Sequence, residues 1–164
     1  MNQEPIQNEN EASEQLISGR TLIVRIGDER FGLPLDLVKE VLELPAVLVS
    51  VPGAPRWMLG IINHHGHVVP VVRMSFLAKV SGADNPKHVI LAKTNQDLIG
   101  LAVDQIESLD MVKQEVVTNC EQTGYSRAWY RGSLLEQFDS AALDKTIRQL
   151  LAQHTRQVDG VPRA

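Results

Sequence analysis

The sequence predicts a mainly β protein with two strand-rich lobes, and three observations support this fold class. β-Branched runs flank a polar centre that contains Gly66, a pattern typical of a hairpin. Residues 68–72 are apolar on both faces, as in a strand buried on both sides, yet they include Pro70, which predicts a sheet edge or a bulge. This combination favours a small barrel, or a junction between two barrels, over a flat sheet. A second set of strand-like runs in the C-terminal half predicts the second lobe.

The composition agrees with a globular chain that binds no nucleic acid. With 164 residues, 43% apolar and 22% charged, the chain suits one domain or two small lobes that share a core. Because it contains two Trp, two Tyr and three Phe, the core must depend on Val, Leu and Ile. The net charge of −4 argues against binding to a phosphate backbone.

The cysteine count and the hydropathy pattern predict a soluble, cytoplasmic protein. Cys120 is the one cysteine, so no internal disulfide framework or thiolate metal cage can form. Residues 1–14 lack the basic and apolar regions of a secretory signal. No apolar run approaches the roughly 20 residues that a membrane-spanning helix needs.

The N-terminal half is predicted to contain strands, one helix and the central hairpin. Residues 1–19 are polar and predict a disordered tail, which a domain over 20–153 follows. Apolar residues at helical spacing from Leu37 to Leu44, with Pro34 before them and Pro45 after them, predict a helix. The alternating or short apolar runs predict strands at 21–27, 30–33, 48–51, 58–64 and 67–72.

The C-terminal half is predicted to contain a helical turn, a second hairpin, a late strand pair and a final helix. The turn covers 74–80, and the hairpin pairs 88–92 with 98–103. Residues 104–109 continue as a strand, and the weaker pattern at 128–135 predicts a strand pair. An amphipathic helix is expected over 141–151, before a flexible tail over 154–164.

Several of these motifs, taken in order, resemble the CheW-like family of chemotaxis coupling proteins. The central stretch Gly60-Ile-Ile-Asn-His-His-Gly-His-Val-Val-Pro-Val-Val-Arg73 is similar to the family's signature hairpin. The run Gly100-Leu-Ala-Val-Asp104, the late Gly132-Ser-Leu-Leu135 and the closing helix also resemble the family's pattern. The resemblance covers roughly residues 21–151, and its specificity lies in the order of several weak motifs.

The resemblance implies a fold of two intertwined five-stranded SH3-like barrels with short peripheral helices and a C-terminal helix. It also implies a non-enzymatic adaptor, without cofactors, that couples chemoreceptors to a CheA-type histidine kinase. The expected partners are the kinase regulatory domain and the cytoplasmic tip of a methyl-accepting chemoreceptor. Flagellar chemotaxis and pilus-based or surface motility both stay open as the pathway.

The resemblance assigns two sets of binding residues, and most of them also have an ordinary structural explanation. The kinase-facing set is Leu35, Val38 and Glu40, and the receptor-facing set is Gly60, Ile62, His65, Gly100 and Leu109. Val38 also fits core packing, and Glu40 also fits a solvated charge. The two glycines also fit close backbone packing or a bulge, and the two aliphatic residues of the receptor set also fit the core.

His65 departs from the family's pattern, which usually has arginine at this position before the turn glycine. Histidine is mostly neutral at pH 7 and lacks the planar fork of arginine, so the departure favours a non-standard pathway. The alternative function is a small-ligand or metal-sensing module that uses His64, His65 and His67. Imidazoles suit zinc, nickel or copper. Because no Cys, Asp or Glu lies nearby in sequence, and strand neighbours point to opposite faces, we predict no metal site.

The sequence does not predict an enzyme either. It contains no Gly-x-Ser-x-Gly elbow, no phosphate-binding glycine loop and no His-Glu-x-x-His helix. Cys120 has no local histidine to activate it and fits a loop thiol. Asp104 and Glu107 could pair, but both fit a strand exit that faces solvent.

Overall fold

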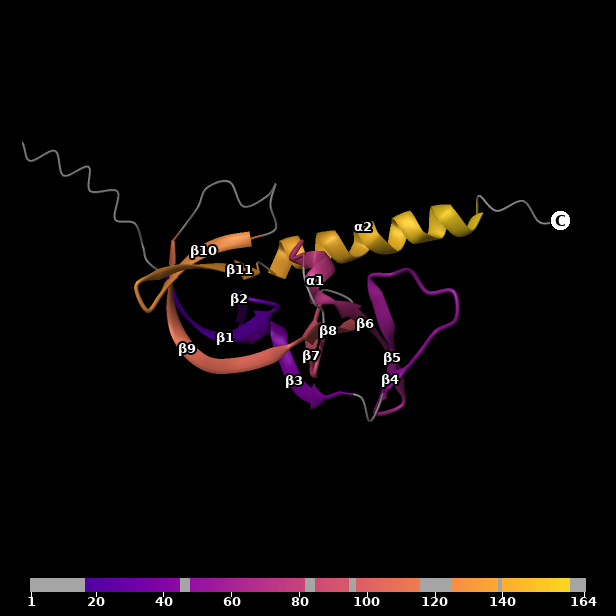
Figure 1. The fold of residues 1–164 in the computed structure, drawn as a ribbon, viewed down its shortest axis with the longest axis horizontal. Coiled ribbons are helices and arrows are strands. Elements are labelled where there is room, and N and C mark those ends of the chain that lie inside the picture. Colours follow the sequence, from indigo (N-terminus) through magenta and orange to yellow (C-terminus); the bar gives the residue numbers. More distant parts are fainter. Residues whose placement is uncertain are drawn as a thin grey trace, which may run out of the picture.

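The computed structural model describes residues 17–44, 48–81, 85–94, 97–115, 125–138 and 140–159. Five strands form a closed barrel in the order β1-β2-β11-β10-β9, and six form a sheet in the order β3-β7-β8-β6-β5-β4. Figure 1 shows the barrel at one end of the molecule, the sheet towards the other, and α2 along one side. The predicted mainly β, two-lobed fold with a C-terminal helix is confirmed, although the second lobe has six strands rather than five because it includes the short strand β4.

The two lobes are intertwined because the chain leaves the barrel and later returns to it. The barrel strands are β1 (Ile17–Ile26), β2 (Glu29–Pro34), β9 (Gln105–Glu115), β10 (Tyr125–Tyr130) and β11 (Ser133–Phe138). The sheet strands are β3 (Val38–Glu43), β4 (Leu48–Val49), β5 (Met58–His64), β6 (His67–Arg73), β7 (His88–Lys93) and β8 (Leu98–Val103). The last strand, β11, pairs in parallel with β2 and thereby closes the barrel around the start of the chain.

The helices are peripheral, and the last one is longer than predicted. A 3-10 turn, η1, covers Leu35–Leu37, and α1 covers Met74–Leu77. The final helix, α2, covers Ser140–Asp159 and therefore extends beyond the predicted range 141–151. Of the two tails predicted from the sequence, residues 1–16 and 160–164 lie outside the described residues, whereas 17–19 belong to β1 and 154–159 to α2.

One hydrophobic core joins the two lobes, and a second core belongs to the sheet. Strand β7 explains this arrangement because both of its faces are buried. Ile90 and Ala92 point into the shared core with β1, β2 and α2, whereas Val89 and Leu91 point into the core of the sheet. A strand in this position needs apolar residues at successive positions. The continuous apolar run of β7 is therefore a consequence of its place between two cores.

The predicted helix at residues 37–44 is wrong. Only η1 is helical, and Val38–Glu43 form β3, which pairs antiparallel with β7. The apolar stripe does not bury one helical face: Leu37 and Val38 contact the shared core, whereas Leu42 and Leu44 contact the core of the sheet. A bulge between Val38 and Glu40 interrupts the side-chain alternation of the strand. The residues before and after the bulge therefore face different cores. Pairing with β7 thus overrides the local helical spacing.

The central hairpin has the predicted bounds, and its turn has the predicted chemistry. β5 and β6 pair from Met58 to Val72, with a bulge between Met58 and Gly60. His65 and Gly66 both have positive φ, at 50° and 85°, which a two-residue hairpin turn requires. Asn63 Oδ1 accepts a hydrogen bond from the Gly66 N–H at 2.9 Å and closes the turn. Strand β6 begins to pair with β8 at Val71, one residue after Pro70. The backbone N–H that proline lacks is therefore not needed for the β6–β8 hydrogen bonds.

Candidate partner-binding surfaces

The η1–β3 segment carries the three residues predicted to face the kinase. Leu35 and Val38 are half-buried, and Val38 also contacts the shared core, so its packing role is present in the structure. Glu40 is exposed, and the next residue, Val41, exposes 41% of its surface, which is high for a β-branched side chain in a strand. β3 stands at one end of the strand order of the sheet. The segment therefore presents an aliphatic surface beside an edge strand.

Three of the residues predicted to face the receptor are buried within the sheet. Ile62 exposes 1% of its surface and belongs to the core of the sheet. A Cβ atom at Gly60 would lie 2.5 Å from the carbonyl oxygen of Val49, and one at Gly100 would lie 2.8 Å from Cγ1 of Val89. These positions favour the packing alternative for all three residues, because each allows close approach of neighbouring groups.

The other two residues of that set are exposed but belong to different lobes. His65 is in the turn between β5 and β6, and Leu109 is on β9 of the barrel. Leu109 exposes 45% of its surface, so the core alternative does not hold for it. The predicted receptor residues thus do not form one continuous surface in this structure.

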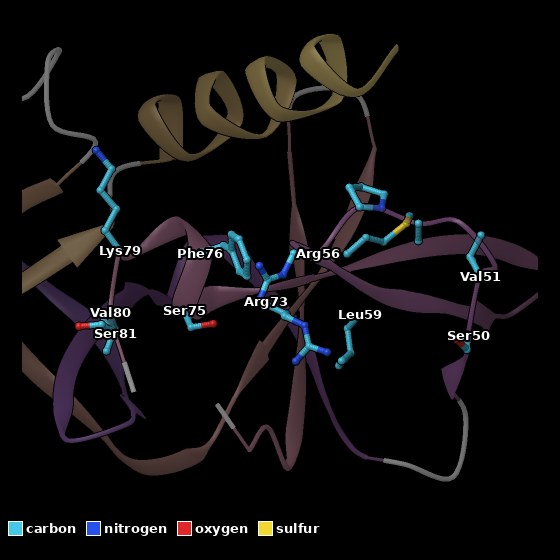
Figure 2. A pocket seen from close by; sticks show the side chains of 13 residues that line it. Ser50, Val51, Arg56, Leu59, Arg73, Ser75, Phe76, Lys79, Val80 and Ser81 are labelled. Atoms are coloured by element: carbon cyan, nitrogen blue, oxygen red, sulfur yellow. The ribbon is translucent and has the colours of Figure 1, made fainter. Parts of the chain in front are cut away.

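A groove of about 830 Å³ lies beside α1, and the sequence analysis did not identify it. Its walls come from the loop between β4 and β5, from β5, and from α1 with the residues that follow it. Figure 2 shows Arg56 and Arg73 close to the ring of Phe76, with Lys79 further along the groove. The side chain of Phe76 is exposed, and no acidic residue lines the groove among the described residues. A ligand with acidic and apolar groups would fit these walls.

The cationic residues of the groove were not recognised because they come from three separate segments. Arg56 follows a Pro-Gly loop, Arg73 ends β6, and Lys79 follows α1. In the sequence, only a weak signal was available: two basic residues, Arg73 and Lys79, lie on either side of the aromatic residue Phe76.

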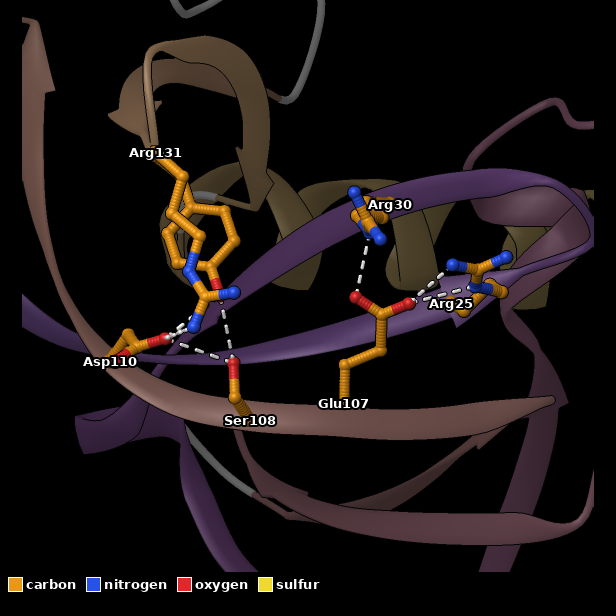
Figure 3. Close-up of polar contacts among 7 residues, drawn as sticks. Arg25, Arg30, Glu107, Ser108, Asp110 and Arg131 are labelled. Carbon is orange, nitrogen blue, oxygen red and sulfur yellow. Dashed lines mark hydrogen bonds and ion pairs between the residues drawn. The ribbon is translucent and has the colours of Figure 1, made fainter.

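On the barrel, one carboxylate joins three strands. Glu107 of β9 accepts hydrogen bonds from Arg25 of β1 at 2.6 and 2.8 Å and from Arg30 of β2 at 2.7 Å. Figure 3 shows Glu107 between the two guanidinium groups. Partial burial raises the pKa of the Glu107 carboxyl, but the hydrogen bonds and charges of both arginines outweigh this effect, so the pKa lies below its usual value.

The expectation that Asp104 and Glu107 face solvent is wrong for both residues. The Glu107 side chain exposes only 17% of its surface. Asp104 accepts a hydrogen bond from the Gly27 N–H at 2.7 Å and so holds the β1–β2 turn. Both carboxylates are used inside the barrel lobe, because β9 runs beside β1 and brings them to its polar groups.

A second polar cluster lies further along β9. Asp110 accepts hydrogen bonds from Tyr130 at 2.8 Å and from Ser108 at 3.0 Å, and Arg131 lies 3.8 Å away. The hydrogen bond from Tyr130, followed by that from Ser108 and by the charge of Arg131, lowers the pKa of the Asp110 carboxyl. Glu107 and Asp110 of β9 are therefore both paired within the barrel.

The structure brings Glu40 to His64 and His65, which the sequence analysis did not foresee. One ligand atom from each side chain lies within 4.8 Å of the other two. The rings of His64 and His65 are 4.3 Å apart although the residues are neighbours, because His65 adopts a left-handed backbone conformation in the turn. Strand alternation therefore does not separate them. His67 is not part of this group, and Cys120 lies outside the described residues.

These observations define a class: a two-lobed β protein with a shared core, a closed barrel in which Glu107 and Asp110 are internally paired, and a sheet that presents aliphatic and cationic surfaces. The chain belongs to the CheW-like domain family, whose model matches residues 20–136. The resemblance noted from the sequence is thereby confirmed.

Individual relatives agree with this membership. The chain is 32% identical over 122 residues to the chemotaxis protein CheW of Rhizobium meliloti, covering 71% of this chain and 77% of that protein. It is 32% identical over 96 residues to a probable chemotaxis protein CheW of Rhizobium etli, covering 57% and 61%. It is also 31% identical over 87 residues to the protein FrzA of Myxococcus xanthus, covering 52% and 54%. The match therefore spans about three fifths of the R. etli protein and about half of FrzA.

A solved structure supports the fold. The scaffolding protein TtCheW of Thermoanaerobacter tengcongensis superposes with a TM-score of 0.63 at 18% identity, over 75% of this chain and 90% of that chain. In the part of the chain that the structure describes, neither helix has the length and apolar character needed to span a membrane.

Proposed function

We propose that this chain is a cytoplasmic adaptor that couples chemoreceptors to a CheA-type histidine kinase and performs no reaction of its own. Membership of the CheW-like family supports the coupling role. One observation supports the choice of the docking surface: β3 is an edge strand, and its exposed Val41 lies beside the half-buried Leu35 and Val38. An edge strand and an aliphatic patch together suit docking to a β-rich partner domain.

The kinase regulatory domain is the proposed partner of the η1–β3 surface. A charged residue at position 41 would leave a carboxylate desolvated in such an interface, so Val41→Asp should weaken binding by about tenfold or more. Because Val41 is exposed, this variant should fold normally. The measurement is titration calorimetry of the purified chain with the regulatory domain of the kinase from the same organism.

The matched control is Met111→Asp on β9, since Met111 exposes 63% of its surface on the barrel. This variant should bind the kinase domain as the unmodified chain does. The proposal fails if the unmodified chain does not bind, or if Met111→Asp weakens binding while Val41→Asp does not.

The receptor tip is the proposed occupant of the groove beside α1. Arg56 and Lys79 supply positive charge, and Phe76 supplies an exposed apolar surface, so a helical tip with acidic and aliphatic residues is complementary to it. The double variant Arg56→Glu with Lys79→Glu should weaken binding of a receptor-tip fragment and reduce the salt dependence of that binding. Lys93→Glu, on the exposed end of β7 and away from the groove walls, is the control. Equal binding by both variants would contradict the groove assignment.

Two features extend or limit this proposal. The departure at His65 keeps pilus-based or surface motility open as the pathway, beside flagellar chemotaxis. A sensing module as the primary function is not favoured, because the matching family is the CheW-like domain and the two Rhizobium relatives are named as chemotaxis proteins.

A further inference from the structure

Three side chains from two distant segments converge at the turn between β5 and β6. Glu40 comes from β3, His64 ends β5, and His65 begins the turn. Each offers one ligand atom, and the three atoms lie within 4.8 Å of one another. His64 Nε2 and Glu40 Oε2 are 3.5 Å apart. The three groups are two imidazoles and one carboxylate, a set that catalytic zinc sites use.

The distances are close to those that a metal ion would impose. With bonds of about 2.0–2.1 Å in tetrahedral geometry, ligand atoms are separated by roughly 3.3–3.5 Å. The His64–Glu40 pair already has this separation. The other two pairs lie within 4.8 Å, and side-chain rotation can adjust them, since Glu40 and His65 are exposed and their side chains have room to move.

The backbone conformation of the turn fixes the positions of the two histidines. His65 has φ of 50°, and the Asn63 side chain fixes the turn through the Gly66 N–H. His64 is buried with only 8% of its surface exposed. The site thus has one rigid ligand on the protein side and two ligands open to solvent, which allows an ion to enter and a water molecule to complete the coordination.

We propose that Glu40, His64 and His65 bind a divalent transition metal ion, with zinc as the best fit. Imidazole nitrogen ligands favour zinc, nickel or copper over magnesium and calcium, which prefer oxygen ligands. The bound ion replaces the direct contact between Glu40 and His64 and links β3 to the hairpin turn. It uses Glu40 of β3, the strand assigned above to the kinase, but all three ligands belong to this chain, so its test needs no partner.

The test is zinc titration of tag-free full-length protein that has been treated with a chelator and dialysed. We expect one zinc ion per chain by calorimetry, and with cobalt(II) in place of zinc we expect the visible absorption of a tetrahedral complex. Glu40→Gln and His65→Gln should each lower zinc affinity by about tenfold or more. Both positions are exposed, so these variants should keep the fold, which circular dichroism would verify.

His67→Gln is the matched control, because His67 is opposite His64 in the hairpin and exposed but outside the ligand group. It should bind zinc as the unmodified chain does. The proposal is overturned if the unmodified chain binds no zinc, if Glu40→Gln binds zinc with unchanged affinity, or if His67→Gln loses binding. Kinase binding measured without zinc is a separate readout, so failure of the metal site leaves the adaptor proposal untouched.

Discussion

The closed barrel and the six-stranded sheet differ in whether all of their strand edges are paired. In the barrel, closure leaves no sheet edge, and Glu107 and Asp110 of β9 are paired with Arg25, Arg30 and Tyr130. The sheet has two end strands, β3 and β4, which expose Val41 and Val49. The lobes therefore differ in strand pairing: each barrel strand has a neighbour on both sides, whereas β3 and β4 each have one unpaired edge. The docking proposal rests on this free edge of β3, because exposed aliphatic residues occur on both lobes.

The largest expected effect concerns the glycines that allow close packing in each lobe. At Gly60, a new Cβ would lie 2.5 Å from a backbone oxygen, which cannot move aside. At Gly32 in the barrel, it would meet side-chain atoms of Thr21 at 2.8 Å and Leu135 at 3.1 Å rather than a backbone atom. We expect Gly60→Ala to lower the free energy of unfolding by about 3 kcal/mol and Gly32→Ala by about 1 kcal/mol. Urea denaturation measures both values, and a larger loss at Gly32 would contradict this account of the sheet.

A smaller effect is expected from the carboxylate that joins β1, β2 and β9. Because the Glu107 pKa is lower in the folded state, its contribution to stability is complete at neutral pH. It should decline as the pH falls through the ordinary glutamate pKa of about 4.3 and be lost below the folded value. Since both arginines are partly exposed, the contribution should be only about 1 kcal/mol.

Glu107→Gln tests this directly. Its free energy of unfolding should be lower than that of the unmodified chain at pH 7, and the difference should shrink towards pH 3. A difference that stays constant across this range would mean that the charge of Glu107 has no role. The same substitution should leave binding at β3 unchanged, since it lies on the other lobe.

The smallest expected effect is local to the second polar cluster of the barrel. Tyr130→Phe removes the hydrogen bond that contributes most to the low pKa of Asp110. The pKa of Asp110 should therefore rise towards its ordinary value, and nuclear magnetic resonance titration of the carboxyl carbon measures this change. An unchanged pKa would mean that Ser108 and Arg131 alone set the value.

The sequence predicted best those features that depend on neighbouring residues. The β5–β6 hairpin was located correctly because Asn63 and Gly66 determine the turn locally. The helix predicted near Val38 failed because the partner strand β7, some 50 residues away, decides the conformation of that segment.

The candidate sites were harder to predict because they depend on contacts between distant segments. Glu40 and His64 are 24 positions apart, and nothing in the local pattern indicates that β3 passes the hairpin turn. The cationic groove is assembled from three segments in the same way. Conversely, Ile62 and Gly100 matched family positions in sequence, but burial shows that their packing role is sufficient to explain them.

We propose the η1–β3 side of the sheet as the docking surface, with the barrel as its support. Hydrogen–deuterium exchange of the full chain, with and without the kinase regulatory domain, tests this most directly. We predict slower exchange on binding in Val38–Glu43, with no change in Gln105–Glu115 of β9. Protection of β9 together with unchanged exchange in β3 would contradict the account.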